Sequence, residues 1–254
     1  MLLVYVDAPF AAFRTFTAGW YRPTATFLTP SAAYGLLLNV AGIETRLREG
    51  EEGHDGKTPA SLTRTGLPMM EVAIGIPDFR LRGRASREVV LEGETFPRVQ
   101  SVFQQLHNYP VGASGKERAE DTKGNKYNIT PVRREFLTEL RAVIAIKTDD
   151  DTDAMIRRGL GVDPPGPRYG VPFLGDNAFL LDRLEELSEP GPVRWFEKVT
   201  SADVGPRERT TRLTICIDRA DLSRTTSALF APGNPESQPP EGAWVKIGAT
   251  AASP

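Results

Sequence analysis

Apolar and polar positions alternate along the chain in a way that predicts several β-strands. Short apolar runs rich in β-branched residues, bounded by polar or glycine-containing segments, are typical of strands. Such runs occur at residues 2–7, 69–76, 139–147, 193–199 and 212–218. We therefore expect a sheet whose strands come from the whole length of the chain.

The clearest helix is expected at residues 29–42. Thr29 can cap its N-terminus, Pro30 suits the first helical position, and Gly42 suits the end. The body of this segment is apolar nearly all round, which predicts burial against a sheet. Gly35 lies in the middle of the segment, where we expect it to permit close packing.

Weaker helical patterns occur elsewhere in the chain. The acidic run before Ala154 favours the N-terminus of a short helix at residues 152–159. Helical spacing also occurs over residues 177–187 and at Val99, Val102, Phe103 and Leu106. By contrast, residues 231–241 are rich in proline and predict no regular element.

Strand, helix, strand, then strand, helix and strand is the order of an α+β, ferredoxin-like βαββαβ domain, which RNA-recognition modules also use. From residue 77 to about residue 134 the pattern changes to short arginine-rich pieces and a long polar loop, which indicates an insertion. We expect one domain at residues 1–200, interrupted by the insertion 77–134. A smaller β-rich region with a flexible tail would follow at 201–254.

Composition and charge narrow the class of protein. Of the 254 residues, 40% are hydrophobic and 25% are charged, as in ordinary soluble proteins. No window approaches the roughly 18 apolar residues that a membrane span needs, so we expect a cytoplasmic protein with no membrane partner. The net charge of -2 argues against a basic surface all over the protein. However, residues 64–87 carry five arginines against two acidic residues, and residues 107–134 carry six basic against three acidic residues.

No metal or cofactor site is evident in the sequence. The two histidines, His54 and His107, are too few for a histidine metal cluster, and the single Cys216 excludes a cysteine-built zinc site. Cys216 lies in an alternating apolar run and is predicted to be a buried strand residue. The acidic spacing at 149–153 lacks the glycine and glutamate of a calcium loop, and residues 112–117 lack two essential positions of a phosphate loop.

Residues 13–37 carry the most specific motif of the chain. They read FRTFTAGWYRPTATFLTPSAAYGLL, an aromatic and basic loop followed by a Pro-Ser-x-x-Tyr-Gly-Leu-Leu helix. This segment resembles the N-terminal signature of the CRISPR-associated Cas-five family, which is part of the RAMP superfamily. Segments at residues 107–137 and 169–175 also resemble motifs of that family.

The resemblance implies a structural subunit of a type I Cascade complex. Such a subunit holds the 5′ handle of the CRISPR RNA and contacts a backbone RAMP subunit and the large subunit. Whether it also contacts target DNA near the PAM stays open. A β-hairpin thumb that wedges the RNA would correspond to the insertion 77–134. The resemblance implies no cofactor.

Single-stranded RNA needs cations for its phosphates and aromatic platforms for its bases, and a helix N-terminus also favours phosphate. On this basis the expected RNA-binding residues are Arg14, Trp20, Tyr21, Arg22, Ser31, Tyr34, His107, Tyr109, Lys116, Lys123, Lys126, Arg133 and Arg134. Other interpretations stay open for several of them. Tyr34 equally suits a helix core, Trp20 suits a core or a subunit interface, and His107 suits a packing role. The arginines also suit an ordinary solvated surface.

Two other functions compete with RNA holding. One subtype of the family cuts the CRISPR RNA precursor without metal, which requires a general base and a nearby cation. In this chain His107 follows Leu106 rather than the lysine of the family's cutters, so we expect no catalytic residue. A scaffold that binds only proteins would be favoured if the basic segments were scattered over the folded surface.

Overall fold

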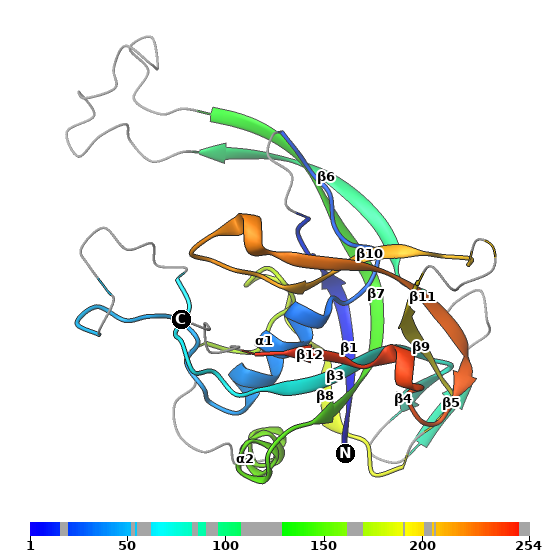
Figure 1. The fold of residues 1–254 in the computed structure, drawn as a ribbon. Helices are drawn as coiled ribbons and strands as arrows, with labels where there is room; N and C mark the ends of the chain where they lie inside the picture. The colour runs from blue at the N-terminus through cyan, green and yellow to red at the C-terminus, as the bar shows by residue number, and fades with distance from the viewer. Residues whose placement is uncertain are drawn as a thin grey trace, which may run out of the picture.

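The computed structural model describes residues 1–15, 20–51, 54, 62–82, 86–89, 96–107, 129–161, 170–189, 191–200, 205 and 207–248. Within these ranges the chain forms a large, mostly antiparallel sheet, a small hairpin and two α-helices (Figure 1). The predicted α+β class is thus confirmed. No helix in the described ranges is long and apolar enough to cross a membrane.

The helices are α1 (Pro30–Val40) and α2 (Asp150–Leu160), with single 3₁₀ turns at Leu222–Arg224 and Glu241–Ala243. The strands are β1 (Leu2–Ala11), β2 (Tyr21–Arg22), β3 (Met70–Pro77), β4 (Phe79–Arg82), β5 (Ser86–Val89), β6 (Arg98–His107), β7 (Ile129–Lys147), β8 (Arg183–Glu186), β9 (Val193–Lys198), β10 (Thr211–Cys216), β11 (Thr226–Glu236) and β12 (Val245–Ile247).

The main path of the large sheet runs β10-β11-β9-β3-β7-β1-β8. Helix α1 connects β1 to β3, and α2 connects β7 to β8. Strand β12 pairs with β3, while β6 and β2 both pair with β7. All these pairs are antiparallel except β2–β7, which is parallel. The long strand β7 therefore contacts four other strands.

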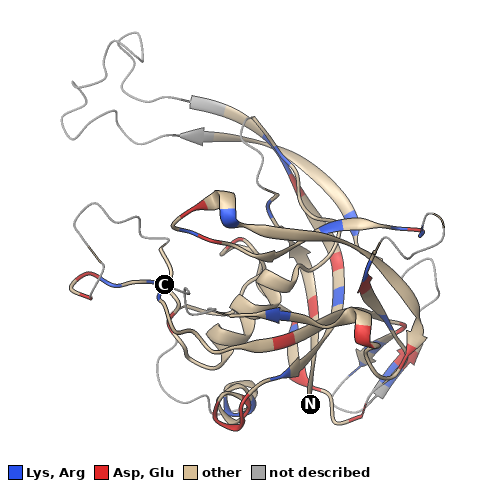
Figure 2. Cartoon of the chain, viewed as in Figure 1, with Lys and Arg blue, Asp and Glu red and all other residues tan. Residues whose placement is uncertain are grey.

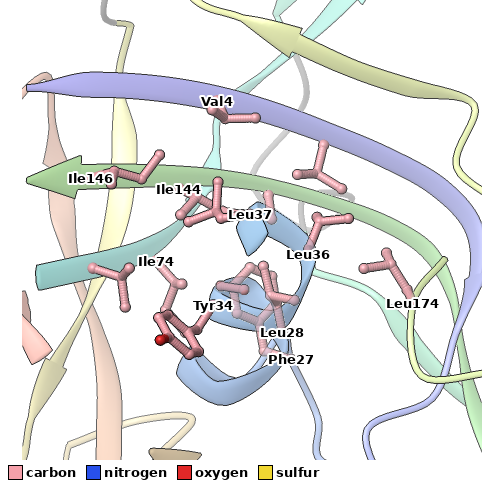
Figure 3. Packing of buried hydrophobic residues seen from close by; sticks show 14 of the residues in the cluster. Val4, Phe27, Leu28, Tyr34, Leu36, Leu37, Ile74, Ile144, Ile146 and Leu174 are labelled. Atoms are coloured by element: carbon pink, nitrogen blue, oxygen red, sulfur yellow. The ribbon is translucent and has the colours of Figure 1, made fainter. Parts of the chain in front are cut away.

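Helix α1 begins and ends as predicted. The Thr29 hydroxyl accepts a hydrogen bond from the amide of Ala32 at 3.2 Å, Pro30 is the first helical residue, and Gly42 follows the helix with φ of 75°. The apolar side of the helix packs against Val4 of β1 and Ile144 of β7, as Figure 3 shows. This interface is the main hydrophobic core.

The opposite face of the central strands is also covered. Side chains that alternate with the main core, among them Leu3, Tyr5 and Val143, form a second buried cluster. The β4–β5 hairpin contributes Phe79 to this cluster, and the Phe79 ring stacks on Tyr5 with centroids 6.0 Å apart. Among the described residues, packed side chains therefore cover both faces of the central strands.

The segment predicted as the helix of the insertion is a strand. Residues 98–107 form β6 and pair continuously with residues 129–138 of β7. The helical spacing of Val99, Val102 and Phe103 was misleading because all three side chains are exposed on a sheet, so they mark no buried helix face. In its described residues, the insertion 77–134 that was predicted as a hairpin-and-helix thumb holds the separate β4–β5 hairpin, strand β6 and the start of β7, and these residues form no helix.

Two other predictions about secondary structure were wrong. Part of the helical patch at 177–187 is strand β8, which pairs with residues 4–7 of β1. Strand β11 extends into the proline-rich segment through a register shift between Pro232 and Pro235, where an irregular ladder tolerates residues that lack an N–H. Cys216 lies in a strand as expected, but it is exposed, because the ladder shifts register between Thr214 and Cys216.

Gly35 and Gly159 lie in the two helices and should respond oppositely to alanine. Gly35 is exposed, and no heavy atom of the described residues lies within 4 Å of its added Cβ, so the predicted close packing is absent. A Cβ at Gly159 would lie 1.9 Å from the carbonyl oxygen of Val40. Gly35→Ala should raise the free energy of unfolding by about 0.5–1 kcal/mol through helix propensity, and Gly159→Ala should lower it by about 1–3 kcal/mol.

Urea denaturation followed by circular dichroism measures both changes. Equal effects of the two substitutions would contradict the packing of α2 against the end of α1.

Candidate nucleic-acid interface

The candidate site is built on the arm, which we define as β6 with residues 129–138 of β7. Figure 1 shows this pair of strands projecting from the sheet beyond α1. Strand β2 pairs with β7 beside the arm, so that Tyr21 lies next to Arg133 and Arg22 next to Arg134. Because successive strand residues point to opposite faces, Arg133 and Arg134 lie on different sides of the arm.

On the first face, Arg133 lies between two aromatic residues. Tyr21 on β2 and Phe103 on β6 are both directly paired with Arg133, which places the three side chains on one face. The Arg133 guanidinium lies 5.7 Å from the centroid of the Tyr21 ring, and it donates a hydrogen bond to the Ser101 hydroxyl at 3.3 Å. Trp20 extends this row, with its ring centroid 6.2 Å from that of Tyr21. We call Trp20, Tyr21, Arg133 and Phe103 the aromatic row.

The aromatic row is open to solvent, and its Tyr21 ring is held by a hydrogen bond. Trp20 is 63% exposed, Tyr21 38% and Phe103 73%. The Tyr21 hydroxyl donates a hydrogen bond to the Glu135 carboxylate, and this bond raises the pKa of Tyr21 above its usual value. The same carboxylate accepts a hydrogen bond from the Thr24 amide at 3.2 Å. Tyr21 is thus held as a neutral ring at physiological pH.

On the second face, three arginines converge. Arg134 forms an ion pair with Asp176, and its guanidinium lies 5.9 Å from the centroid of the Phe179 ring. Burial lowers the pKa of Arg14, and the nearby charges of Arg134, Arg22 and, to a smaller extent, Arg219 lower it further, while Asp176 opposes the shift. We call Arg14, Arg22 and Arg134 the arginine cluster. Its mutual repulsion would be relieved by a bound anion such as phosphate.

A loop near residue 175 holds Asp176 in this cluster. Leu174 is buried in the main core, and its carbonyl accepts a hydrogen bond from the Ala12 amide at 3.1 Å. Gly175 has φ of 80°, and a Cβ there would lie 1.6 Å from the Ala12 carbonyl oxygen, so only glycine fits. Asp176 then accepts a hydrogen bond from the Ala178 amide at 3.0 Å, and this bond and Arg134 lower the pKa of its carboxyl.

Sequence reasoning missed several residues of the site. Phe103 was assigned to a helix, and Asp176 was not considered. Phe10, Phe136 and Phe179 form a group of rings with centroids 5.8–6.1 Å apart beside Arg134. The glycine before Asp176 is a turn signal that could have marked the loop. The pairing of distant strands left no comparable local signal for Phe103.

Ser31 and Tyr34, which were also expected to bind RNA, occupy a different part of the fold. The Ser31 and Thr29 hydroxyls lie 3.1 Å apart at the start of α1. Tyr34 is buried in the main core, as Figure 3 shows, and its hydroxyl donates a hydrogen bond to the Pro68 carbonyl at 2.8 Å. Burial raises the pKa of Tyr34 to about 12. The structure therefore gives Tyr34 a packing role.

Of the remaining predicted residues, the structure describes only His107, at the far end of the arm. His107 is the last residue of β6 and is paired with Ile129 of β7. The others, Tyr109, Lys116, Lys123 and Lys126, lie outside the described residues.

Three arginines among the described residues of the basic segment 64–87 lie beside carboxylates. Arg64 pairs with Glu51, Arg80 lies 3.5 Å from Asp7, and Arg82 lies 2.6 Å from Glu88. Figure 2 shows basic residues interspersed with acidic ones over the described part of the chain. Among those residues, no three His, Cys, Asp or Glu side chains are grouped to hold a metal ion. The arginine cluster is therefore assembled from distant segments rather than from one basic stretch.

The model of the family described as "CRISPR-associated protein (Cas_Cas5)" matches residues 1–161. A solved chain described as "CRISPR RNA-guided surveillance complex" is 12% identical, with a TM-score of 0.51 and 95% of both chains covered. Another, described as "Crystal structure of Cas protein", is 13% identical over 95% of this chain and 98% of the other, with a TM-score of 0.43. No curated protein sequence matches. At this identity, the first structural similarity concerns the fold alone.

The two neighbouring arginines of β7 should differ in their effect on stability. The Arg134 side chain is 13% exposed and that of Asp176 19%, so Arg134→Ala leaves a largely buried carboxylate without its partner. We expect a loss of about 2 kcal/mol or more in the free energy of unfolding. Arg133→Ala, on the exposed face, should change it by less than about 0.5 kcal/mol. Urea denaturation of both variants measures this difference, and a larger loss for Arg133→Ala would contradict the assignment of faces.

Proposed function

Because the chain belongs to the CRISPR-associated Cas5 family, whose model matches residues 1–161 of its 254 residues, we propose that it is a structural subunit of a type I Cascade complex. In this role it binds the 5′ handle of the CRISPR RNA with the arginine cluster and the aromatic row. Such a subunit acts in the cytoplasm during RNA-guided recognition of foreign DNA.

The observation that carries the proposal is the arginine cluster. Arg14, Arg22 and Arg134 come from three segments; the Asp176 carboxylate lies near Arg134 and Arg14, and Arg22 adds a third positive charge near Arg14. Folding three cations together is unfavourable unless an anion compensates them. The phosphates of RNA supply regularly spaced anions, and arginine is the residue best suited to bind them.

The topology also supports the proposal. The order β3-β7-β1-β8, with α1 and α2 as the connections, agrees with a ferredoxin-like βαββαβ domain of the RAMP type. We assign this domain to residues 1–200 and the thumb to the insertion 77–134, which contains β6. We assign residues 201–254 to a C-terminal β-rich region and tail, and β12 of that region pairs with β3.

Because side chains cover both faces of the central strands, we expect RNA to bind to the arm. In RNA-recognition modules, bases stack on aromatic residues of an exposed sheet face. Here the β4–β5 hairpin and α1 cover the two faces of the central strands. The arm lies beyond α1 and the β4–β5 hairpin, so its exposed aromatic and basic side chains are accessible to RNA.

A protein contact is expected beside the arginine cluster. Val171, Phe173 and Leu180 are exposed apolar residues in the loop segment that also holds Asp176. Grouped apolar side chains on a surface mark contact sites for other proteins. We assign this surface to the backbone RAMP subunit or the large subunit of the complex.

Reversing the charge of Arg22 tests the RNA-binding role. Arg22→Glu, alone and combined with Arg14→Glu, should weaken binding of a single-stranded handle RNA at least tenfold at moderate salt. The plot of log K against log salt should become shallower, by about one unit for each phosphate that the protein no longer neutralises. Filter binding over a salt series measures both quantities.

The control variant is Arg158→Glu, which makes the same charge change on α2 and lies far from the arm in Figure 1. If all variants lost affinity equally, net charge rather than the arginine cluster would be responsible, and the proposal would fail.

The protein is proposed to hold RNA without cutting it. Full-length repeat RNA incubated with the purified protein in EDTA should therefore remain intact on a denaturing gel. Discrete cuts that disappear in His107→Ala would instead identify a metal-independent endoribonuclease that processes the CRISPR RNA precursor.

A further inference from the structure

We propose that the aromatic row is a stacking platform for two adjacent unpaired bases of the bound strand, with one base on Phe103 and the next on Tyr21 and Trp20. The phosphate between the two bases then lies over Arg133. This inference rests on the proposed function, since the strand is taken to be RNA. It assigns a binding role to Phe103.

The spacing of the strands supports this arrangement. Neighbouring strands lie about 4.8 Å apart, so Tyr21 and Phe103, on either side of β7, are separated by about 10 Å. Arg133 occupies the position between them. One base therefore cannot bridge both rings, whereas two splayed bases can each cover one ring and leave their phosphate at the guanidinium.

The surroundings of Phe103 favour a base over an apolar protein surface. Its neighbours on the same face of β6 are Ser101 and Gln105, and both are exposed polar residues. Across β7 the neighbour is the cation of Arg133. An interface with another protein usually has an apolar centre that is depleted of charged residues. Single rings between polar and cationic groups are instead typical of surfaces that bind single-stranded nucleic acid.

The platform is preorganised. The amide of Arg133 donates a hydrogen bond to the Trp20 carbonyl at 2.7 Å, which fixes β2 against β7. Glu135 accepts hydrogen bonds from the Tyr21 hydroxyl and the Thr24 amide, so the carboxylate is engaged with the β2 segment. Rings that are already fixed lose little conformational freedom when a base binds.

Stacking on a ring uses the face of the base and not its hydrogen-bonding edge. Every base has such a face, so the platform should accept any base at the two positions. Replacing either nucleotide by another should then change affinity by less than about threefold.

Fluorescence of 2-aminopurine tests the platform directly. The full-length protein is titrated into single-stranded RNAs with the handle sequence, each carrying 2-aminopurine at a different position. Quenching should be confined to two neighbouring positions. Phe103→Ala should abolish quenching at one of them and weaken binding about tenfold, without changing the salt dependence, because the cations that neutralise the phosphates are all retained.

Val102→Ala is the matched control, since Val102 is exposed on the same strand but points to the other face. It should leave quenching and affinity unchanged. Arg22→Glu should weaken binding and reduce the salt dependence, yet keep the two quenched positions at saturating protein.

The outcomes separate this inference from the proposed function. Tight RNA binding with no effect of Phe103→Ala, or with equal effects of Phe103→Ala and Val102→Ala, would overturn the platform and leave the RNA-holding role intact. Failure of the wild-type protein to bind the RNA at all would overturn the proposed function. Quenching by DNA of the same sequence, with none by RNA, would assign the bases to a DNA strand and also overturn the inference.

Discussion

Strand β7 is the element on which the rest of the structure depends, because one strand serves both the core and the arm. Its C-terminal half pairs with β1 and β3 and buries Ile144 against α1. Its N-terminal half pairs with β6 and β2. Because β7 is one continuous strand that includes Glu139, with φ of 59°, the register that buries Ile144 also determines the faces on which Arg133 and Arg134 lie. A slip of one residue would exchange their roles.

Covering both faces of the central strands has a functional consequence. Helix α1 closes one face and the β4–β5 hairpin closes the other, so burial stabilises the sheet but removes it as a binding surface. On the arm, by contrast, Val102 and Phe103 of β6 and Arg133 of β7 are exposed. There, Arg134 is held by Asp176 and contributes to stability as well as charge, whereas Arg133 remains available to a ligand. Adjacent arginines in sequence thus perform different tasks.

Elements were predictable where their signals are local. Thr29, Pro30 and Gly42 marked α1 correctly because capping acts within a few residues. The apolar run at 139–147 likewise indicated the buried half of β7. Strand β6 was misassigned because its apolar side chains Val99, Val102 and Phe103 are exposed, so their spacing carries no information about burial. Strand β11 was missed because proline usually ends a ladder, and only its pairing with β9 accommodates Pro232 and Pro235.

The sequence by itself determined the family signature at residues 13–37 and helix α1. It also indicated candidate RNA-binding residues, among them Trp20, Tyr21, Arg22, Arg133 and Arg134. Only the tertiary structure decided how these residues combine. Tyr21 and Arg133 are 112 positions apart, and they meet because β2 pairs with β7, while Phe103 joins them from β6. Strand pairing is a long-range choice that depends on the packing of the whole sheet, so no local pattern encodes which side chains share a face.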